Sequence, residues 1–261
     1  MNPEYRVALI DSIEGMAHLA REWNGLLKKS RSNTIFLTWE WLYSWAESFL
    51  NPNRRLFILQ VYKENKITGL APWCIRHTGY RGNWIKQIGF LGTPEAGSDY
   101  LDVFSIPGKE KEVARSIYQF LKGSTSLWDV LVLKDISSDS LFLLHMLNQM
   151  EADGKYVELC PASFCPSAAL PKTEEVFLAH LSSHRRKHFL RECRILLKEG
   201  GGTFQSARLE DLDFNMEEFY RIYRERWGIS EEHVRFLENY RARCQNKHLM
   251  QVDLLTAENK T

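Results

Sequence analysis

The chain has 261 residues, the length of one large domain or two ordinary ones. Its composition, with 44% hydrophobic and 26% charged residues, is that of a globular protein and excludes a mainly disordered chain. Because 34 Lys and Arg stand against 33 Asp and Glu, the net charge of +1 gives no overall field that would attract nucleic acid or a membrane surface. Any cationic binding site must therefore be local.

The sequence shows none of the usual signs of export. It has no run of about 18 apolar residues, and its charged start, MNPEYRVALIDSIEG, does not resemble a signal peptide. We therefore expect a cytoplasmic protein without membrane insertion. The cysteines are odd in number and have no C-x-x-C spacing, so we expect reduced thiols in the core and no zinc ribbon. They are Cys74, Cys160, Cys165, Cys193 and Cys244.

Two helices are predicted before Pro52. Asp11 followed by Glu14 is typical of a capping box and predicts a helix over 13–29. Thr38 can cap a second helix, in which aromatic residues recur at helical spacing. Such a cluster is typical of a buried core, although a stacking surface for bases or sugars is an alternative. Its members are Phe36, Trp39, Trp41, Trp45 and Phe49.

Strands are the main elements predicted in the next hundred residues. Together with the predicted helices, they indicate an α/β (α+β) fold. An antiparallel meander is predicted over 55–62, 68–76 and 83–91, and residues 76–82 form a hairpin connection rather than a phosphate-binding loop. After residue 99, strands and helices alternate, which predicts a mixed sheet with helices on its faces. The expected strands are 100–106, 128–133 and 155–159, and the expected helices are 109–121 and 138–150.

Three prolines, Pro161, Pro166 and Pro171, predict an extended connector. We therefore expect a first lobe over 1–160, a connector over 161–171 and a second region over 172–261. The second region is predicted to contain helices 173–181, 183–199, 215–227 and 231–245, and strands 203–207 and 249–256. Because two strands are too few for an independent sheet, and the last one runs into a polar turn without a returning strand, we expect an N-terminal fragment of a longer protein.

The predicted helix over 183–199 is strongly basic. Glu192 is the only acid between residues 184 and 198, and four cations, Lys187, Arg191, Arg194 and Lys198, form one stripe. An apolar stripe on another face predicts that the helix is docked with its cations outward. Arginine binds phosphate well, so the stripe could contact a nucleotide sugar, a coenzyme or RNA. The alternative is an ordinary solvated helix face.

The sequence gives little support for a metal site or for a pair of acid–base residues. His180, His184 and His188 are spaced by four residues, but a helix break after the first and the adjacent cations argue against a metal site. Asp99 and Asp102 would point to opposite faces of a strand, so they do not form an acid–base pair. We expect turn capping by Asp99, which could line a cleft, and a surface role for Asp102. No G-x-S-x-G elbow supports a hydrolase.

A set of short motifs in a fixed order resembles the CelD-like acyltransferases, a GNAT-related family named for cellulose biosynthesis. The resemblance covers most of residues 30–228. The motifs are FLTWEWL (36–42), GLAP (69–72), IGFLG (88–92), SDYLD (98–102), FLAHLSS (177–183), the cluster Arg185-Arg186-Lys187, RECRILL (191–197) and Gly200-Gly201.

The resemblance implies two GNAT-like lobes, as in the FemAB aminoacyltransferases, with a mixed sheet and flanking helices in each. It also implies transfer of an acyl group, acetyl for example, from acyl-CoA to an amine or hydroxyl of a saccharide-type acceptor. The GNAT pyrophosphate loop, Q/R-x-x-G-x-G/A, is not found in the sequence. We therefore expect the acyl-CoA site beyond residue 261, no cofactor-binding residue and no metal in this chain, and a fragment that is inactive by itself.

No catalytic base is assigned at this point. We expect Arg185, Arg186, Lys187 and Arg191 to contact an anionic substrate or the interface between lobes, with Asp99 at the cleft. Two alternatives stay open: a non-catalytic scaffold in polysaccharide assembly, and a FemAB-like aminoacyltransferase that uses aminoacyl-tRNA. Only the last of these would bring the cationic helix against nucleic acid.

Overall fold

The computed structural model describes residues 5–80, 82–161, 163–166, 168–207, 212–244, 247 and 249–256. The chain divides into two compact units, one formed by Met1–Ala162 with Ser230–Lys247 and the other by Ser163–Ile229 with His248–Thr261. The first unit therefore combines two separate stretches of sequence. Its late stretch contains helix α9, Glu231–Cys244.

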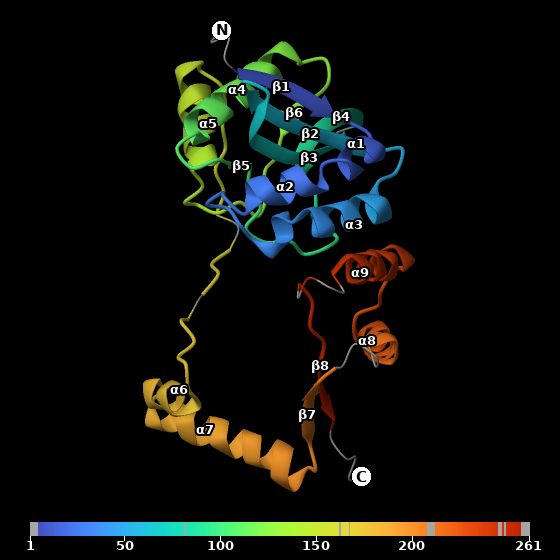
Figure 1. Ribbon diagram of the computed structural model, residues 1–261, viewed down its shortest axis with the longest axis vertical. Coiled ribbons are helices and arrows are strands. Elements are labelled where there is room, and N and C mark those ends of the chain that lie inside the picture. Colours follow the sequence, from blue (N-terminus) through green and yellow to red (C-terminus); the bar gives the residue numbers. More distant parts are fainter. Residues whose placement is uncertain are drawn as a thin grey trace. The chain divides into compact units, whose positions relative to one another are not determined.

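A mixed sheet forms the centre of the first unit (Figure 1). Its strand order is β1-β2-β3-β4-β6, and the short β5 pairs with β3. Neighbouring strands are antiparallel from β1 to β4, whereas β4 and β6 are parallel. The predicted meander and the mixed sheet are thus confirmed. The strands are β1 Tyr5–Ile10, β2 Arg54–Lys63, β3 Lys66–Tyr80, β4 Asn83–Phe90, β5 Phe104–Ser105 and β6 Val130–Leu131.

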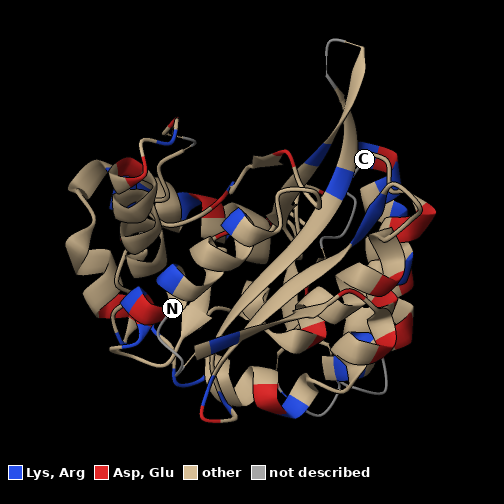
Figure 2. Ribbon diagram, turned by 90° about the horizontal axis from the view of Figure 1, so that it is seen from above, with Lys and Arg blue, Asp and Glu red and all other residues tan. Residues whose placement is uncertain are grey.

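Helices cover both faces of this sheet. Phe57 and Trp73 are cross-strand partners, so their side chains share one face, where they meet Phe120 of α4 and Phe142 of α5. On the other face Trp23 of α2 lies against Phe104. Figure 2 shows the long strands nearly free of charged residues, as burial on both faces requires. The helices are α1 Ile13–Ala17, α2 Ala20–Leu27, η1 Ile35–Leu37, α3 Trp39–Phe49, α4 Glu110–Gly123 and α5 Leu141–Ala152.

Local sequence determines where these helices begin. Thr38 caps α3 as predicted, with its hydroxyl accepting from the Trp41 backbone N–H. The first helix is capped by Ser12 and not by Asp11, and it is divided into α1 and α2. The aromatic cluster belongs to the core, with Trp45 fully buried. Trp41 packs edge-on against Phe236 of α9, with ring centroids 4.9 Å apart.

Three predicted strands of the first unit are much shorter than expected or absent, and only Asp253–Thr256 of the predicted strand 249–256 is a strand. Only Phe104–Ser105 of the segment 100–106 pairs as a strand, because Tyr100 has a φ of 53° and turns the chain. Only Val130–Leu131 of the segment 128–133 is a strand. Residues 155–159 form no strand because they pair with no neighbour among the described residues. The hairpin over 76–82 is confirmed up to Arg81, which lies outside the described residues.

In the described part of the second unit, several helices and one antiparallel strand pair are joined by irregular segments. The pair joins Thr203 to Thr256 and Ser206 to Asp253. The predicted domain boundary, with a connector over 161–171 and a second lobe from residue 172, stays a prediction. The elements are α6 Glu174–His180, α7 Ser183–Arg194, the π-helical segment η2 Ile195–Glu199, β7 Thr203–Ser206, α8 Leu212–Arg226 and β8 Asp253–Thr256.

The positions of the cysteines agree only in part with the prediction that they lie in the core. Cys74 and Cys244 are buried, as expected, whereas Cys160 and Cys165 are exposed in the proline-rich segment, where the chain has no core to enter. All five are free thiols. Within the part of the chain that the structure describes, every helix is too short or too polar to cross a bilayer.

Candidate functional site

The two parallel strands of the sheet separate at their carboxyl ends. Gln87 pairs with Val130 and Ile88 with Leu131, and the Val132 N–H donates to the Ile88 carbonyl oxygen over 2.9 Å. Beyond this bond the chain after β6 turns toward another partner, since Leu101 N–H donates to the Asp135 carbonyl oxygen over 2.9 Å. A small pocket occupies the space where the strands part.

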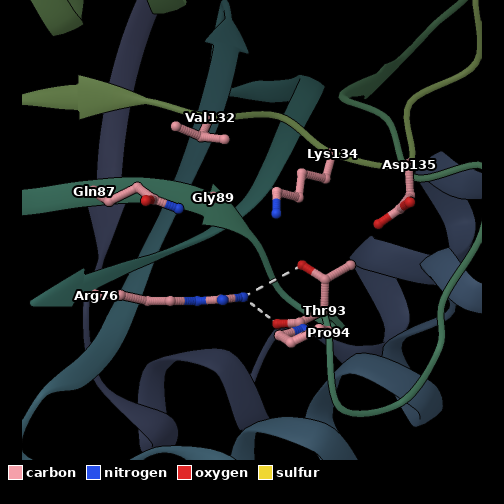
Figure 3. Close-up of a pocket in the computed structure, with 8 residues that line it drawn as sticks. All are labelled: Arg76, Gln87, Gly89, Thr93, Pro94, Val132, Lys134 and Asp135. Atoms are coloured by element: carbon pink, nitrogen blue, oxygen red, sulfur yellow. Dashed lines mark hydrogen bonds between the residues drawn. The ribbon is translucent and has the colours of Figure 1, made fainter. Parts of the chain in front are cut away.

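The pocket has a volume of about 70 Å³ and is lined by polar and charged groups. This volume holds a few water molecules or the reacting end of a substrate, and it is well below the size of a typical site for a whole ligand. Gly89 has no side chain to fill the pocket. A Cβ at this position would lie 3.4 Å from the Val132 carbonyl oxygen. The lining residues, shown in Figure 3, are Arg76, Gln87, Gly89, Thr93, Pro94, Val132, Lys134 and Asp135.

One wall of the pocket is the loop 91–98, which Arg76 of β3 holds. The guanidinium Nη2 of Arg76 donates to both the carbonyl oxygen and the hydroxyl of Thr93 (Figure 3). The Nε atom of Arg76 is buried and has no hydrogen-bond partner among the described residues. Arg76 therefore fixes the wall and keeps a donor near the cavity, where an anionic or carbonyl group could bind.

The opposite wall carries Lys134 and Asp135, whose side chains face the Arg76 guanidinium across the pocket (Figure 3). Asp135 has a φ of 59°, a conformation that aspartate tolerates better than most residues. Partial burial, and then the nearby Asp99 carboxylate, raise the pKa of Asp135 above its usual value. A carboxylate with a raised pKa at a pocket is suited to accept a proton.

The structure places Asp99 and Asp102 differently. Asp99 is exposed in the first unit, close enough to Asp135 to affect its pKa. Asp102 is only 6% exposed, so its predicted surface role is wrong. Its carboxylate can be buried because it accepts three hydrogen bonds. The hydroxyls of Ser32 and Ser140 each donate over 2.7 Å, and the Val103 N–H donates over 2.8 Å.

The four predicted cations lie on α7, in the second unit. Arg185 and Lys187 are exposed, and Arg191 pairs with Glu192 over 2.8 Å. Arg186 caps the end of α6, since its Nε donates to the Leu178 carbonyl oxygen over 2.7 Å. Their roles stay predictions.

The apolar stripe of α7 is less covered than predicted. No residue of α7 is buried, and Phe189 is 39% exposed. Phe189 contacts Phe177 of α6, with centroids 5.8 Å apart, but the seven residues of α6 are too few to cover the stripe. Nowhere in the described residues do three His, Cys, Asp or Glu side chains gather as metal ligands would.

Sequence reasoning missed the pocket residues. The predicted hairpin over 76–82 is confirmed for its described residues, but Arg76 also faces the pocket from the β3 end of that hairpin. Lys134 and Asp135 follow β6 directly. Polar residues just after a strand that has a parallel neighbour are the signal that could have found them.

Comparisons with known proteins bear on the fold. Neither the known protein families nor the curated proteins include a significant match to this sequence. Among solved structures, the chain is similar to the crystal structure of FemX, with a TM-score of 0.54 and 15% identity, over 90% of this chain and 56% of that chain. The chain therefore has a mixed α/β fold, with a mixed sheet and flanking helices, that is similar to the fold of FemX. It spans a little over half the length of FemX.

Two further solved structures overlap with part of the chain. A possible acetyltransferase from Clostridium difficile 630 matches with a TM-score of 0.37 and 7% identity, over 64% of this chain and 99% of that chain. A ribosomal-protein-alanine N-acetyltransferase from Brucella melitensis biovar Abortus 2308 matches with a TM-score of 0.35 and 11% identity, over 62% and 98%.

Proposed function

We propose that this chain belongs to an acyltransferase of the CelD-like kind, which transfers an acyl group, acetyl for example, from acyl-CoA to an amine or hydroxyl of a saccharide-type acceptor. One observation carries the proposal: in a GNAT-like strand order, the parallel strands β4 and β6 part at a polar pocket. Such an opening at the carboxyl ends of parallel strands is a common place for a ligand in α/β proteins.

The pocket residues suit the acceptor end of this reaction. The acceptor nitrogen forms a bond to the acyl carbon, the carbon–sulfur bond of the thioester breaks so that coenzyme A leaves as the thiolate, and the proton of the nitrogen passes to the Asp135 carboxylate. The raised pKa of Asp135 brings its proton affinity closer to that of the reacting amine. Arg76 and Lys134 line the same pocket and favour an acceptor that carries a negative charge. In this proposal Asp99 affects the reaction by raising the pKa of Asp135.

The size of the pocket limits what it can hold. About 70 Å³ accommodates the reacting groups but not a coenzyme, whose phosphates must bind elsewhere. The exposed cations Arg185 and Lys187, with Arg186 and Arg191 beside them, are the predicted anion contacts of α7. We retain them in the proposal as contacts for an anionic substrate or for the lobe interface.

The test combines binding with transfer, because the chain spans 56% of the length of FemX and acceptor binding does not require a donor site. Glucosamine 6-phosphate, which has both an amine and an anionic group, is titrated into the protein by calorimetry, with glucose 6-phosphate and glucosamine as matched controls. We expect glucosamine 6-phosphate to bind most tightly of the three. Thiol release from acetyl-CoA then reports transfer. If none of the three sugars and no acetyl-CoA binds, the proposal fails in favour of a non-catalytic scaffold.

A second candidate, an aminoacyltransferase that uses aminoacyl-tRNA, is favoured by the similarity to FemX over 90% of the chain. Here α7 would contact tRNA phosphates. Replacing Arg185 and Lys187 by alanine should then weaken tRNA binding and lower its salt dependence by about two counterions. The charge-matched control replaces Arg6 and Lys63 of the first unit. Equal effects of the two double variants would reject a specific tRNA surface on α7.

A further inference from the structure

The wall of the pocket is held by several elements at once. Besides the bonds from Arg76 to Thr93, the Ser98 hydroxyl donates to the Gly92 carbonyl oxygen over 2.8 Å. Trp41 of α3 donates to the same hydroxyl oxygen over 2.9 Å. Arg54 of β2 forms an ion pair with Glu95 over 2.7 Å. The loop 91–98 is therefore positioned by surrounding structure, as the wall of a specific site should be.

Helix α9 supplies one more contact to this loop, from 138 residues further along the chain. Nε2 of His233 lies 2.8 Å from the Glu95 carbonyl oxygen. Since a carbonyl oxygen only accepts, Nε2 carries the hydrogen. The Ser230 hydroxyl lies 2.9 Å from Nδ1, and the ring packs edge-on against Phe49 at 5.2 Å. These contacts fix the ring orientation.

The position of α9 is itself well defined. Phe236 is 2% exposed and packs between Trp41 and Phe49 of α3. Arg235 donates to the Ser48 carbonyl oxygen over 2.9 Å, and Arg243 pairs with Glu47 over 2.6 Å. The donor on His233 is therefore presented by a packed helix and not by a free side chain.

We propose that His233 is a positioning residue for the pocket: by holding the Glu95 carbonyl group it keeps the Thr93–Pro94 wall at the distance from Lys134 and Asp135 that the acceptor requires. Its effect on catalysis rests on the proposed function, whereas its effect on the loop does not. The loop that forms one wall of the pocket is thus held by a segment from late in the sequence, which belongs to the same compact unit.

The test compares His233→Ala with His233→Gln, whose amide can still donate, and with Arg243→Ala, which removes an α9–α3 contact without touching the loop. Amide hydrogen exchange is measured over residues 91–98. Loss of one hydrogen bond predicts about five- to tenfold faster exchange in His233→Ala. Exchange near the wild-type rate is expected in the other two variants. Equal exchange in His233→Ala and Arg243→Ala would overturn the proposal.

Kinetics and a milder variant complete the test. In the transfer assay the acceptor KM should rise about fivefold in His233→Ala with kcat little changed, and it should return toward the wild-type value in His233→Gln. A wild-type protein that binds neither the three sugars nor acetyl-CoA rejects the proposed function but leaves the exchange result interpretable. If His233→Ala folds poorly, Ser230→Ala removes only the hydroxyl that orients the ring, and about twofold faster exchange in the same loop is expected. Unchanged exchange in Ser230→Ala would count against the proposal.

Discussion

At the scale of single residues, the proposed reaction depends on the carboxylate of Asp135. Partial burial and the Asp99 carboxylate both disfavour its ionised form, so its pKa lies above the usual value for aspartate. A group that must be ionised to accept a proton loses activity as pH falls through its pKa. The pH profile of transfer should therefore have an acid limb that belongs to Asp135.

This assignment predicts a shift on changing Asp99. Asp99→Asn removes the neighbouring negative charge, so the pKa of Asp135 falls and the acid limb of kcat/KM moves to lower pH. Asp135→Asn should lower kcat about 10²- to 10⁴-fold, the usual contribution of a general base. The shift of the acid limb and the loss of kcat are both measured from the pH dependence of the transfer rate. An acid limb that stays in place in Asp99→Asn would show that another group titrates.

Gly89 offers a second test of the site with little effect on the fold. A Cβ at this position makes an ordinary contact at 3.4 Å, so Gly89→Ala should change the free energy of unfolding by less than about 1 kcal/mol. Gly89→Leu should extend into the pocket and lower acceptor affinity at least tenfold. Calorimetry and urea unfolding separate the two effects. Acceptor binding that is equal in the leucine and alanine variants would place the acceptor elsewhere.

At the scale of elements, Asp102 joins three segments of the first unit. Its carboxylate accepts from Ser32 after α2, from Ser140 at the start of α5, and from Val103 before β5. Burial raises its pKa, and the hydrogen bonds from Ser32 and Ser140 oppose the shift. The folded state therefore holds the proton more tightly than the unfolded state, and the stability that this gives at low pH is lost as pH rises through the folded pKa.

Two variants of Asp102 should differ in stability. Asp102→Ala leaves buried donors without an acceptor and should lower the free energy of unfolding by about 3 kcal/mol. Asp102→Asn keeps one acceptor oxygen and cannot ionise, so its stability relative to the wild type should improve from pH 4 to pH 7. Urea unfolding at the two pH values measures this. A difference between the asparagine variant and the wild type that is independent of pH would contradict the raised pKa.

The contact of Glu40 in α3 with Lys247, which follows α9 in the chain, has the opposite pH dependence. Burial acts to raise the pKa of Glu40, but hydrogen bonds from Lys247 and Asn24 outweigh it and hold the pKa below its usual value. The Lys247 Nζ lies 2.5 Å from the carboxylate. A lowered pKa stabilises the fold above the unfolded value, about 4.3, and this stabilisation is lost as pH falls through the folded pKa.

Glu40→Gln should therefore lower the free energy of unfolding by about 1.5 kcal/mol at pH 7, toward the low end for a charged hydrogen bond because Lys247 is half exposed. The difference from the wild type should shrink as pH falls below 4. Guanidinium unfolding followed by tryptophan fluorescence measures it, since Trp41 packs against α9. A constant difference from pH 7 to pH 3.5 would contradict the assigned ion pair.

At the scale of the whole molecule, sequence reasoning succeeded where local pattern decides the structure. The Thr38 cap, the helical spacing of the Trp residues and the alternating runs of the meander depend on neighbouring residues, so the sequence alone predicted α3 and β2 to β4. The mixed sheet with helices on its faces was predictable for the same reason.

The pocket and the position of α9 depend on distant contacts. Arg76 and Asp135 are 59 residues apart in sequence, and only the parallel pairing of β4 with β6 brings their strands together. His233 reaches Glu95 from 138 residues away. No periodicity encodes such contacts, since they result from sheet order and helix packing. For the same reason Asp102, surrounded by donors from separate segments, was misplaced on the surface.

The most direct measurement of the central claim is amide hydrogen exchange of the wild-type protein with and without glucosamine 6-phosphate and acetyl-CoA, followed along the whole chain. If the acceptor end of an acyltransferase lies where β4 and β6 part, protection should concentrate in residues 87–94 and 132–135. Protection confined to other segments, with none at these two, would contradict the account.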